Sequence, residues 1–144
     1  MIKIICIGKL KEQYLKEGIN DYYNRINKYH KIEIIELPDS NIDKEKELIL
    51  KNINTKDYII TLDIEGINLS SKELADKLDK TFITNSNITF IIGGSDGLHQ
   101  DIKNLSNYSL SFSKLTFPHG LFRLILLEQI YRSFKILNHE SYHK

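Results

Sequence analysis

The stretch ITFIIGGSDGL, residues 88–98, begins as an apolar run and ends in three closely spaced glycines. A short, continuous run of β-branched and apolar residues is typical of a strand that is covered on both faces. We therefore expect a strand over 88–92 that passes directly into a loop at its carboxyl end. In open α/β sheets, that end of the strands is where ligands bind.

The glycine loop, 93–97, does not match the common phosphate-binding patterns. Its spacing is G-G-x-x-G, whereas dinucleotide-binding folds have G-x-G-x-x-G, and it lacks the lysine of the G-x-x-x-x-G-K-[ST] loop. Asp96 would also repel a phosphate group. Two interpretations remain open: a tight turn in which glycine supplies a positive φ angle, or one wall of a site for a ligand without phosphates.

Outward from this strand, other apolar runs alternate with amphipathic segments. The sequence SSKE at 70–73 is a capping box that predicts the start of one helix. Strands alternating with helices predict a single α/β domain over residues 1–144, with a mainly parallel sheet flanked by helices. The predicted strands are 2–8, 32–37, 57–66, 88–92 and 108–113, and the predicted helices are 10–29, 43–53, 70–82 and 119–137.

Composition sets limits on the class of protein. The chain has 144 residues, 41% of them hydrophobic and 27% charged, as in an ordinary globular domain. Cys6 is the only cysteine, so no internal disulfide is possible, and no apolar stretch is long enough for a membrane span. These features predict a cytoplasmic protein with no membrane partner.

Charge gives a weaker indication of the partner. The formal net charge is +1, which argues against a globally basic nucleic-acid binder. The ends of the chain are mildly basic around an acidic middle, since residues 1–32 carry +4, residues 33–80 carry −5 and residues 81–144 carry +2. A normally solvated mixed surface is the simpler explanation of this distribution.

The predicted helix 119–137 is apolar around more of its circumference than one sheet-facing stripe requires. A second apolar face indicates a second contact. Both a two-fold homodimer and deep burial within one chain would satisfy it.

Two further segments carry groups that could do chemistry. In TFPHG, 116–120, His119 is expected near the start of a helix, as a site residue or as a capping or core histidine. The tail NHESYHK, 138–144, combines aromatic and cationic groups suited to an RNA base and phosphate, although a frayed end is the simpler interpretation. His139 and His143 have no cysteine or acidic cluster nearby, so we expect no metal site.

Several motifs taken together resemble one family. They are TLDIEG, IIGGSDGL, SLSFSKLTFPHGLFRLILLEQIYR, the terminal YHK and the opening MIKIICIGKLKEQYLKEGINDYYNR. The chain is similar nearly from end to end to the ribosomal RNA large-subunit methyltransferase H family, which are small SPOUT-class enzymes.

The resemblance implies a homodimer with a C-terminal trefoil knot. It implies an enzyme that uses S-adenosylmethionine to methylate N3 of a pseudouridine in large-subunit ribosomal RNA on the assembled ribosome. A non-catalytic ribosome-binding factor with the same fold and a flavodoxin-like nucleotide-binding module are the alternatives.

Site residues follow from the resemblance position by position. The expected residues of the target-base pocket, with a catalytic role, are His119, Arg123, Tyr142 and His143. Of these, Arg123 is expected to hold RNA phosphate or a base oxygen, and Tyr142 or His143 to assist removal of the acceptor proton. The expected cofactor-binding residues are Leu62, Gly93, Gly94, Phe112, Ser113, Lys114, Leu115, Thr116 and Phe117.

Overall fold

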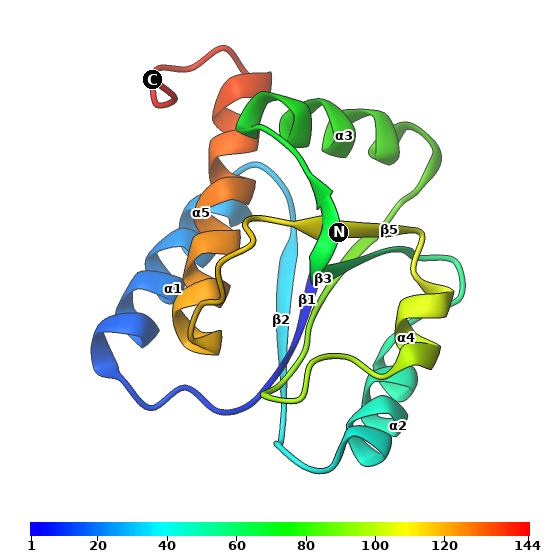
Figure 1. Ribbon diagram of the computed structural model, residues 1–144. Helices are drawn as coiled ribbons and strands as arrows, with labels where there is room; N and C mark the ends of the chain where they lie inside the picture. The colour runs from blue at the N-terminus through cyan, green and yellow to red at the C-terminus, as the bar shows by residue number, and fades with distance from the viewer.

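Five strands form one parallel sheet in the spatial order β2-β1-β4-β3-β5, which confirms the predicted α/β class. The computed structural model describes residues 1–144 and is drawn in Figure 1. The strands are β1 (Ile2–Ile7), β2 (Ile32–Leu37), β3 (Tyr58–Asn68), β4 (Ile88–Ile92) and β5 (Tyr108–Ser111). The helices are α1 (Gln13–Asn27), α2 (Ile42–Asn52), α3 (Ser71–Thr84), α4 (Gln100–Leu105) and α5 (His119–Leu137).

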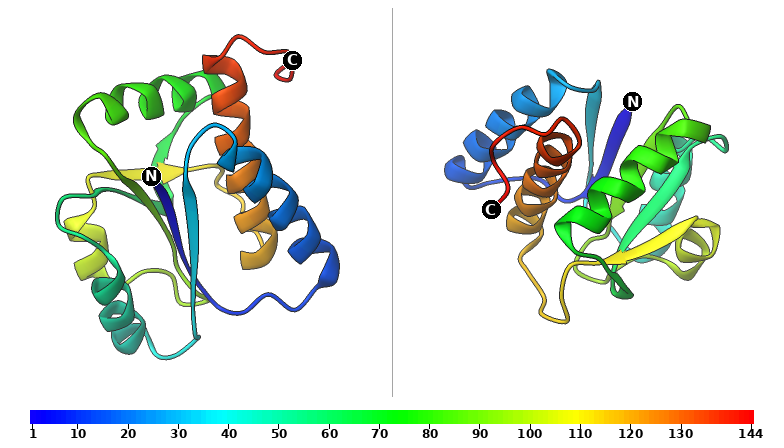
Figure 2. Two further views of the ribbon diagram at one scale, coloured as in Figure 1. Left: turned by 180° about the vertical axis from the view of Figure 1, so that it is seen from behind. Right: turned by 90° about the horizontal axis from the view of Figure 1, so that it is seen from above.

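Two apolar clusters cover the opposite faces of the sheet. The larger contains Ile4 and Phe90 and is covered by α1, α3 and α5, whereas the smaller contains Ile5 and Ile91 and is covered by α2 and α4. Successive strand residues point to opposite faces, so neighbouring isoleucines enter different clusters. Because both faces are covered, the sequences of the central strands are continuous apolar runs. Figure 2 shows α1, α5 and α3 side by side over one face.

The edge pair β3 and β5 is irregular at its carboxyl end. Leu110 is paired with both Leu62 and Ile67, so residues 63–66 leave the regular ladder. A Cβ atom on Gly66 would lie 2.7 Å from the Ser109 carbonyl oxygen, and glycine therefore permits the two backbones to approach. This irregularity continues β3 to Asn68, beyond the predicted end at residue 66.

Most predicted elements are confirmed with small shifts at their ends. The capping box is present, with Ser70 accepting from the Glu73 amide and Glu73 accepting from the Ser70 amide. Helix α4 was not predicted; it has six residues, and its first turn is capped by the His99 side chain, which accepts from the Asp101 amide. Helix α1 begins at Gln13 rather than at residue 10.

Helix α5 lies between α1 and α3 and buries much of its surface within the chain, including Leu126 and Ile130. Leu121 and Ile125 on the same helix are only partly buried. Burial within one chain therefore explains most of the apolar circumference, and the homodimer and the knot stay predictions. None of the helices is long and apolar enough to cross a membrane.

The C-terminal tail is not frayed. His139 adopts a left-handed conformation with φ of 55°, its amide donates to the Ile136 carbonyl, and the Glu140 amide donates to the Lys135 carbonyl. These two hydrogen bonds form a Schellman motif, in which glycine is the usual residue at the position of His139. The motif turns the chain, and the final residues fold back beside α5 (Figure 1).

Candidate functional site

A cleft of about 410 Å³ opens at the carboxyl ends of β3, β4 and β5. This volume lies within the usual range for small-molecule sites. Its walls are the segments that follow these three strands: residues 62–64, the glycine loop and the segment 110–117. The start of α5 lies at one side. The location is the one at which α/β sheets bind ligands.

The glycine loop forms its wall through a tight turn. The Gly97 amide donates to the Gly94 carbonyl at 3.0 Å, and Gly97 has φ of +75°. A Cβ atom on Gly93 would lie 2.7 Å from the carbonyl carbon and oxygen of Gly97. The turn thus needs glycine at both positions for its own geometry, and it still exposes its backbone to the cleft. Both interpretations of this loop are therefore compatible.

The segment after β5 supplies an aromatic wall. Phe112 and Phe117 line the cleft and each lies against Phe122, with ring centroids 5.2 and 6.0 Å apart. Ser113 fixes the bend, because its hydroxyl accepts from the Leu115 amide at 3.0 Å. Apolar and aromatic surfaces next to exposed backbone and hydroxyl groups suit a nucleoside better than a phosphate.

The structure brings together eight of the nine expected cofactor-binding residues. Lys114 is the exception, since it is exposed and does not line the cleft. The eight are Leu62, Gly93, Gly94, Phe112, Ser113, Leu115, Thr116 and Phe117. Sequence reasoning missed Asp63 and Lys103, which line the same cleft. Asp63 directly follows Leu62 at the strand end and could have been found there, whereas Lys103 depends on the unpredicted helix α4.

His119 lies at the mouth of this cleft. It is the first residue of α5, exposed, and part of the cleft lining. No side chain caps the helix at this point, so His119 does not have the capping role that was the alternative. Its imidazole makes no hydrogen bond within the chain and is available to a ligand at the cleft mouth.

Arg123 differs from expectation. It is only 3% exposed, its guanidinium donates to Glu36 at 2.7 Å and to the Gly8 carbonyl at 3.1 Å, and it does not line the cleft. One helical turn after His119, the side chain points toward the sheet instead of toward solvent. The expected contact of Arg123 with RNA is therefore corrected: this residue joins α5 to the ends of β1 and β2.

Tyr142 and His143 are held by a polar network on α5. The Tyr142 hydroxyl donates to Glu128 Oε1 at 3.1 Å and lies 3.3 Å from the Tyr22 hydroxyl. Arg132 Nε donates to the same Glu128 oxygen, and Arg132 Nη1 lies 3.0 Å from His143 Nδ1. Arginine can only donate, so His143 Nδ1 is the acceptor. Burial raises the pKa of the Tyr142 hydroxyl above its ordinary value, so this group stays protonated well beyond neutral pH.

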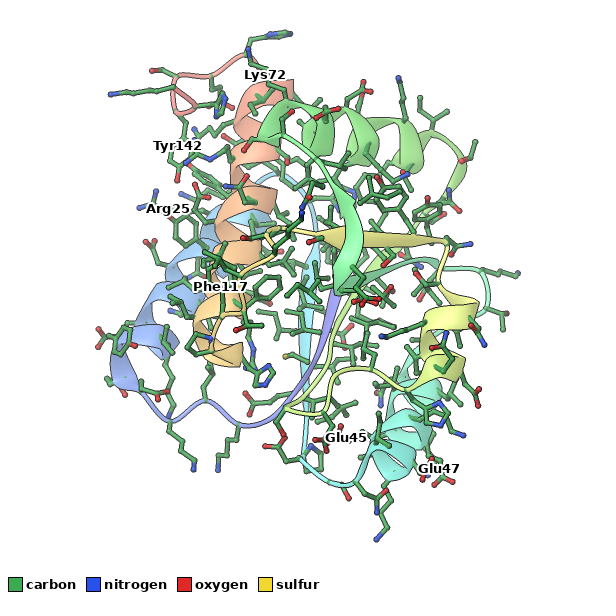
Figure 3. The ribbon with its side chains drawn as sticks, in the orientation of Figure 1. Arg25, Glu45, Glu47, Lys72, Phe117 and Tyr142 are labelled. Atoms are coloured by element: carbon green, nitrogen blue, oxygen red, sulfur yellow. The ribbon has the colours of Figure 1, made fainter.

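The tail residues and His119 are far apart within one chain. Glu128, which binds Tyr142, is nine positions after His119, or about 14 Å along the helix axis, and Arg132 is about 20 Å along it. Figure 3 shows Tyr142 beside the C-terminal half of α5 and Phe117 near its N-terminal part. The structure therefore separates the four expected catalytic residues into a cleft residue, a buried residue and a tail pair.

No group of three or more His, Cys, Asp or Glu side chains is placed to hold a metal ion. His139 and His143 serve the tail turn and the Arg132 contact instead. The chemistry available at the cleft is accordingly that of an imidazole, a carboxylate, an amine and several hydroxyl and backbone groups beside an apolar pocket.

Comparisons with known proteins agree with this geometry. Residues 1–143 match the family model described as "Predicted SPOUT methyltransferase". A ribosomal RNA large subunit methyltransferase H from Alkaliphilus oremlandii is 51% identical over 99% of each chain, and a putative one from Methanococcus maripaludis is 48% identical over the same shares.

Solved structures support the fold. A probable methylase family protein from Haemophilus influenzae has a TM-score of 0.59 at 14% identity, covering 99% of this chain and 70% of its own. The tRNA (m1G37) methyltransferase from Aquifex aeolicus has a TM-score of 0.56 at 14% identity, covering 91% and 69%. With the match over nearly the whole length and the relatives at about half identity, the chain belongs to the SPOUT methyltransferases and, within them, to the ribosomal RNA large subunit methyltransferase H family.

Proposed function

We propose that this chain is an S-adenosylmethionine-dependent methyltransferase that methylates N3 of a pseudouridine in large-subunit ribosomal RNA. It acts as a homodimer on the assembled ribosome. The observation that carries the proposal is the cleft, because three strand exits and the start of α5 combine an apolar nucleoside-sized wall with a histidine at its mouth. The names of the whole-length relatives supply the substrate class.

The residues present fit the cofactor. Phe112 and Phe117 offer flat aromatic surfaces for an adenine ring, Leu62 adds an apolar contact, and the glycine loop offers backbone at close range. When bound there, S-adenosylmethionine would supply an electrophilic methyl group for in-line transfer to a nitrogen. The chain itself positions donor and acceptor, which is the main catalytic task in such a displacement.

The acceptor nitrogen carries a proton that must leave before or during transfer. His143 is our candidate for removing that proton; Nδ1 is the only ring nitrogen of the neutral imidazole that can accept, so it must turn from Arg132 to the acceptor to take the proton. Tyr142 would turn its one O–H from Glu128 to the base oxygen on which negative charge develops. His119, at the cleft mouth, would contact the base or its phosphate.

The separation along α5 favours a site built from two copies. Glu128 and Arg132, which hold the tail pair, lie about 14 and 20 Å along the α5 axis from His119 of the same chain, so we assign the tail pair to the cleft of the partner. The partly buried apolar residues Leu121 and Ile125 of α5 are available for the contact between copies. A homodimer would then carry two composite sites.

The ribosome as substrate agrees with the charge of the chain. Phosphate contacts dominate affinity for nucleic acid, and a protein of net charge +1 offers few of them. A folded ribosomal surface can supply shape and protein contacts that free RNA lacks. We therefore expect methyl transfer to assembled ribosomes and little or none to free RNA of the same sequence.

Calorimetry and subunit mixing test these assignments. S-adenosylmethionine should bind the wild-type chain, and absence of binding would leave the non-catalytic ribosome-binding factor as the better account.

Subunit mixing tests the composite site. A cleft variant, Phe117→Ala, is mixed with a tail variant, His143→Ala. Random exchange gives half heterodimers with one intact site of two, so activity should return to about one quarter of wild type. No recovery after confirmed exchange would place tail and cleft of one active site in the same chain.

A further inference from the structure

Asp63 and Lys103 form an ion pair inside the cleft. Asp63 Oδ2 lies 3.2 Å from Lys103 Nζ, and the two side chains are 15% and 35% exposed. Among the residues that line the cleft, Asp63 is the only carboxylate and Lys103 is the only lysine or arginine. These two side chains therefore dominate the electrostatic potential that a cofactor would meet.

The two partners differ in how firmly they are held. Asp63 lies where β3 leaves its ladder with β5, and its Oδ1 accepts from the Glu65 amide at 3.1 Å. This hydrogen bond and low exposure fix the carboxylate. Lys103 is on the six-residue helix α4 and reaches Asp63 through a flexible four-carbon arm. The lysine can move away, whereas the aspartate remains in the cleft wall.

Methyl transfer changes the charge of the nucleoside in such a cleft. The C–S bond breaks with its electron pair left on sulfur, the new C–N bond forms with the acceptor's electron pair, and the acceptor proton goes to the base. The positively charged sulfonium thus becomes a neutral thioether. A fixed negative charge nearby attracts the first species more than the second.

We propose that Asp63 selects the sulfonium cofactor over its thioether product, and that Lys103 reduces this selection by partly neutralising the carboxylate. Loss of the cofactor's charge after transfer then weakens the attraction to Asp63, and Lys103 pairs with it again as the product leaves. The inference rests on the proposed use of S-adenosylmethionine and adds a residue pair that sets specificity and product release.

Isothermal titration calorimetry of S-adenosylmethionine and S-adenosylhomocysteine measures the effect as a ratio of two affinities in each variant. Asp63→Asn should lower the preference for the sulfonium by roughly five-fold, a screened charge effect for a partly exposed site. Lys103→Gln should raise it by a similar factor. The double variant should resemble Asp63→Asn, because without the carboxylate there is no attraction left to neutralise.

Matched controls come from surface ion pairs outside the cleft. Asp76→Asn removes a carboxylate paired with Lys80, and Lys46→Gln removes an amine paired with Asp101. Neither should change the ratio. An unchanged ratio in both Asp63→Asn and Lys103→Gln would overturn the inference, even if both ligands bound more weakly.

The outcomes also separate this inference from the proposed function. If the wild-type chain bound neither ligand, the proposed cofactor itself would be wrong and the inference would fall with it. If Asp63→Asn did not fold, as judged by thermal unfolding, Lys103→Gln would still decide, since a ratio that does not rise contradicts the role given to the pair.

Discussion

Gly93→Ala perturbs the turn that forms one wall of the cleft. The new Cβ atom would lie 2.7 Å from both the carbonyl carbon and oxygen of Gly97 and 3.1 Å from Leu98 Cδ2. The first two atoms are backbone, so the loop must shift to relieve the contact. Overpacking of this kind costs about 1–3 kcal/mol. A loss of about 1.4 kcal/mol from the free energy of binding, within this range, lowers the affinity for S-adenosylmethionine about tenfold.

Gly18→Ala is the matched control for this variant. Its Cβ atom would also be crowded, at 3.1 Å, but by the terminal methyl groups of Leu124, which can rotate away. Gly18 lies within α1, away from the cleft, so cofactor affinity should not change. Urea denaturation and calorimetry of both variants give stability and affinity separately. A Gly93→Ala protein with wild-type stability and affinity would refute the argument that the turn requires glycine.

Three further predictions concern residues whose roles the structure defines. Arg123→Ala should lower the free energy of unfolding by about 2 kcal/mol, because Glu36 and the Gly8 carbonyl lose their donor; a higher KM for ribosomes at unchanged stability would contradict this structural role. His139→Gly should raise stability by roughly 1 kcal/mol by removing a left-handed non-glycine residue, and no gain in urea denaturation would argue against the Schellman turn. Burial raises the pKa of Cys6 to about 11 from 9.0, so the thiol should resist a disulfide reagent at pH 8.5 until urea unfolds the chain, and rapid labelling of the folded protein would be inconsistent with its buried position.

The sequence predicted the sheet well because burial on both faces leaves a strong local signal. The continuous apolar runs of β1 and β4 and the capping box at Ser70 each depend on neighbouring residues only. Helix α4 was missed because it has six residues and one buried apolar side chain, Ile102, which is too little for a helical period. The extension of β3 beyond Gly66 was missed because it depends on a register shift against β5.

The candidate site was likewise predictable from the sequence only in part. Residues of the cleft walls follow the strands directly, so their convergence could be inferred from the order of parallel strands and from the family resemblance. The burial of Arg123 could not, because it depends on Glu36 and Gly8 from two other strand ends. The docked tail likewise depends on contacts of Tyr142 with Tyr22, 120 residues earlier in the sequence, and with Glu128, 14 residues earlier.

Transfer of a labelled methyl group to ribosomes is the decisive assay for the proposed methyltransferase activity. Wild-type protein, S-adenosylmethionine labelled in its methyl group and ribosomes that lack the modification are incubated, and the large-subunit RNA is digested and analysed by mass spectrometry. We expect label at N3 of a pseudouridine, on assembled ribosomes and not on free RNA. Absence of label, or label on a ribose or on a different base, would contradict the proposal.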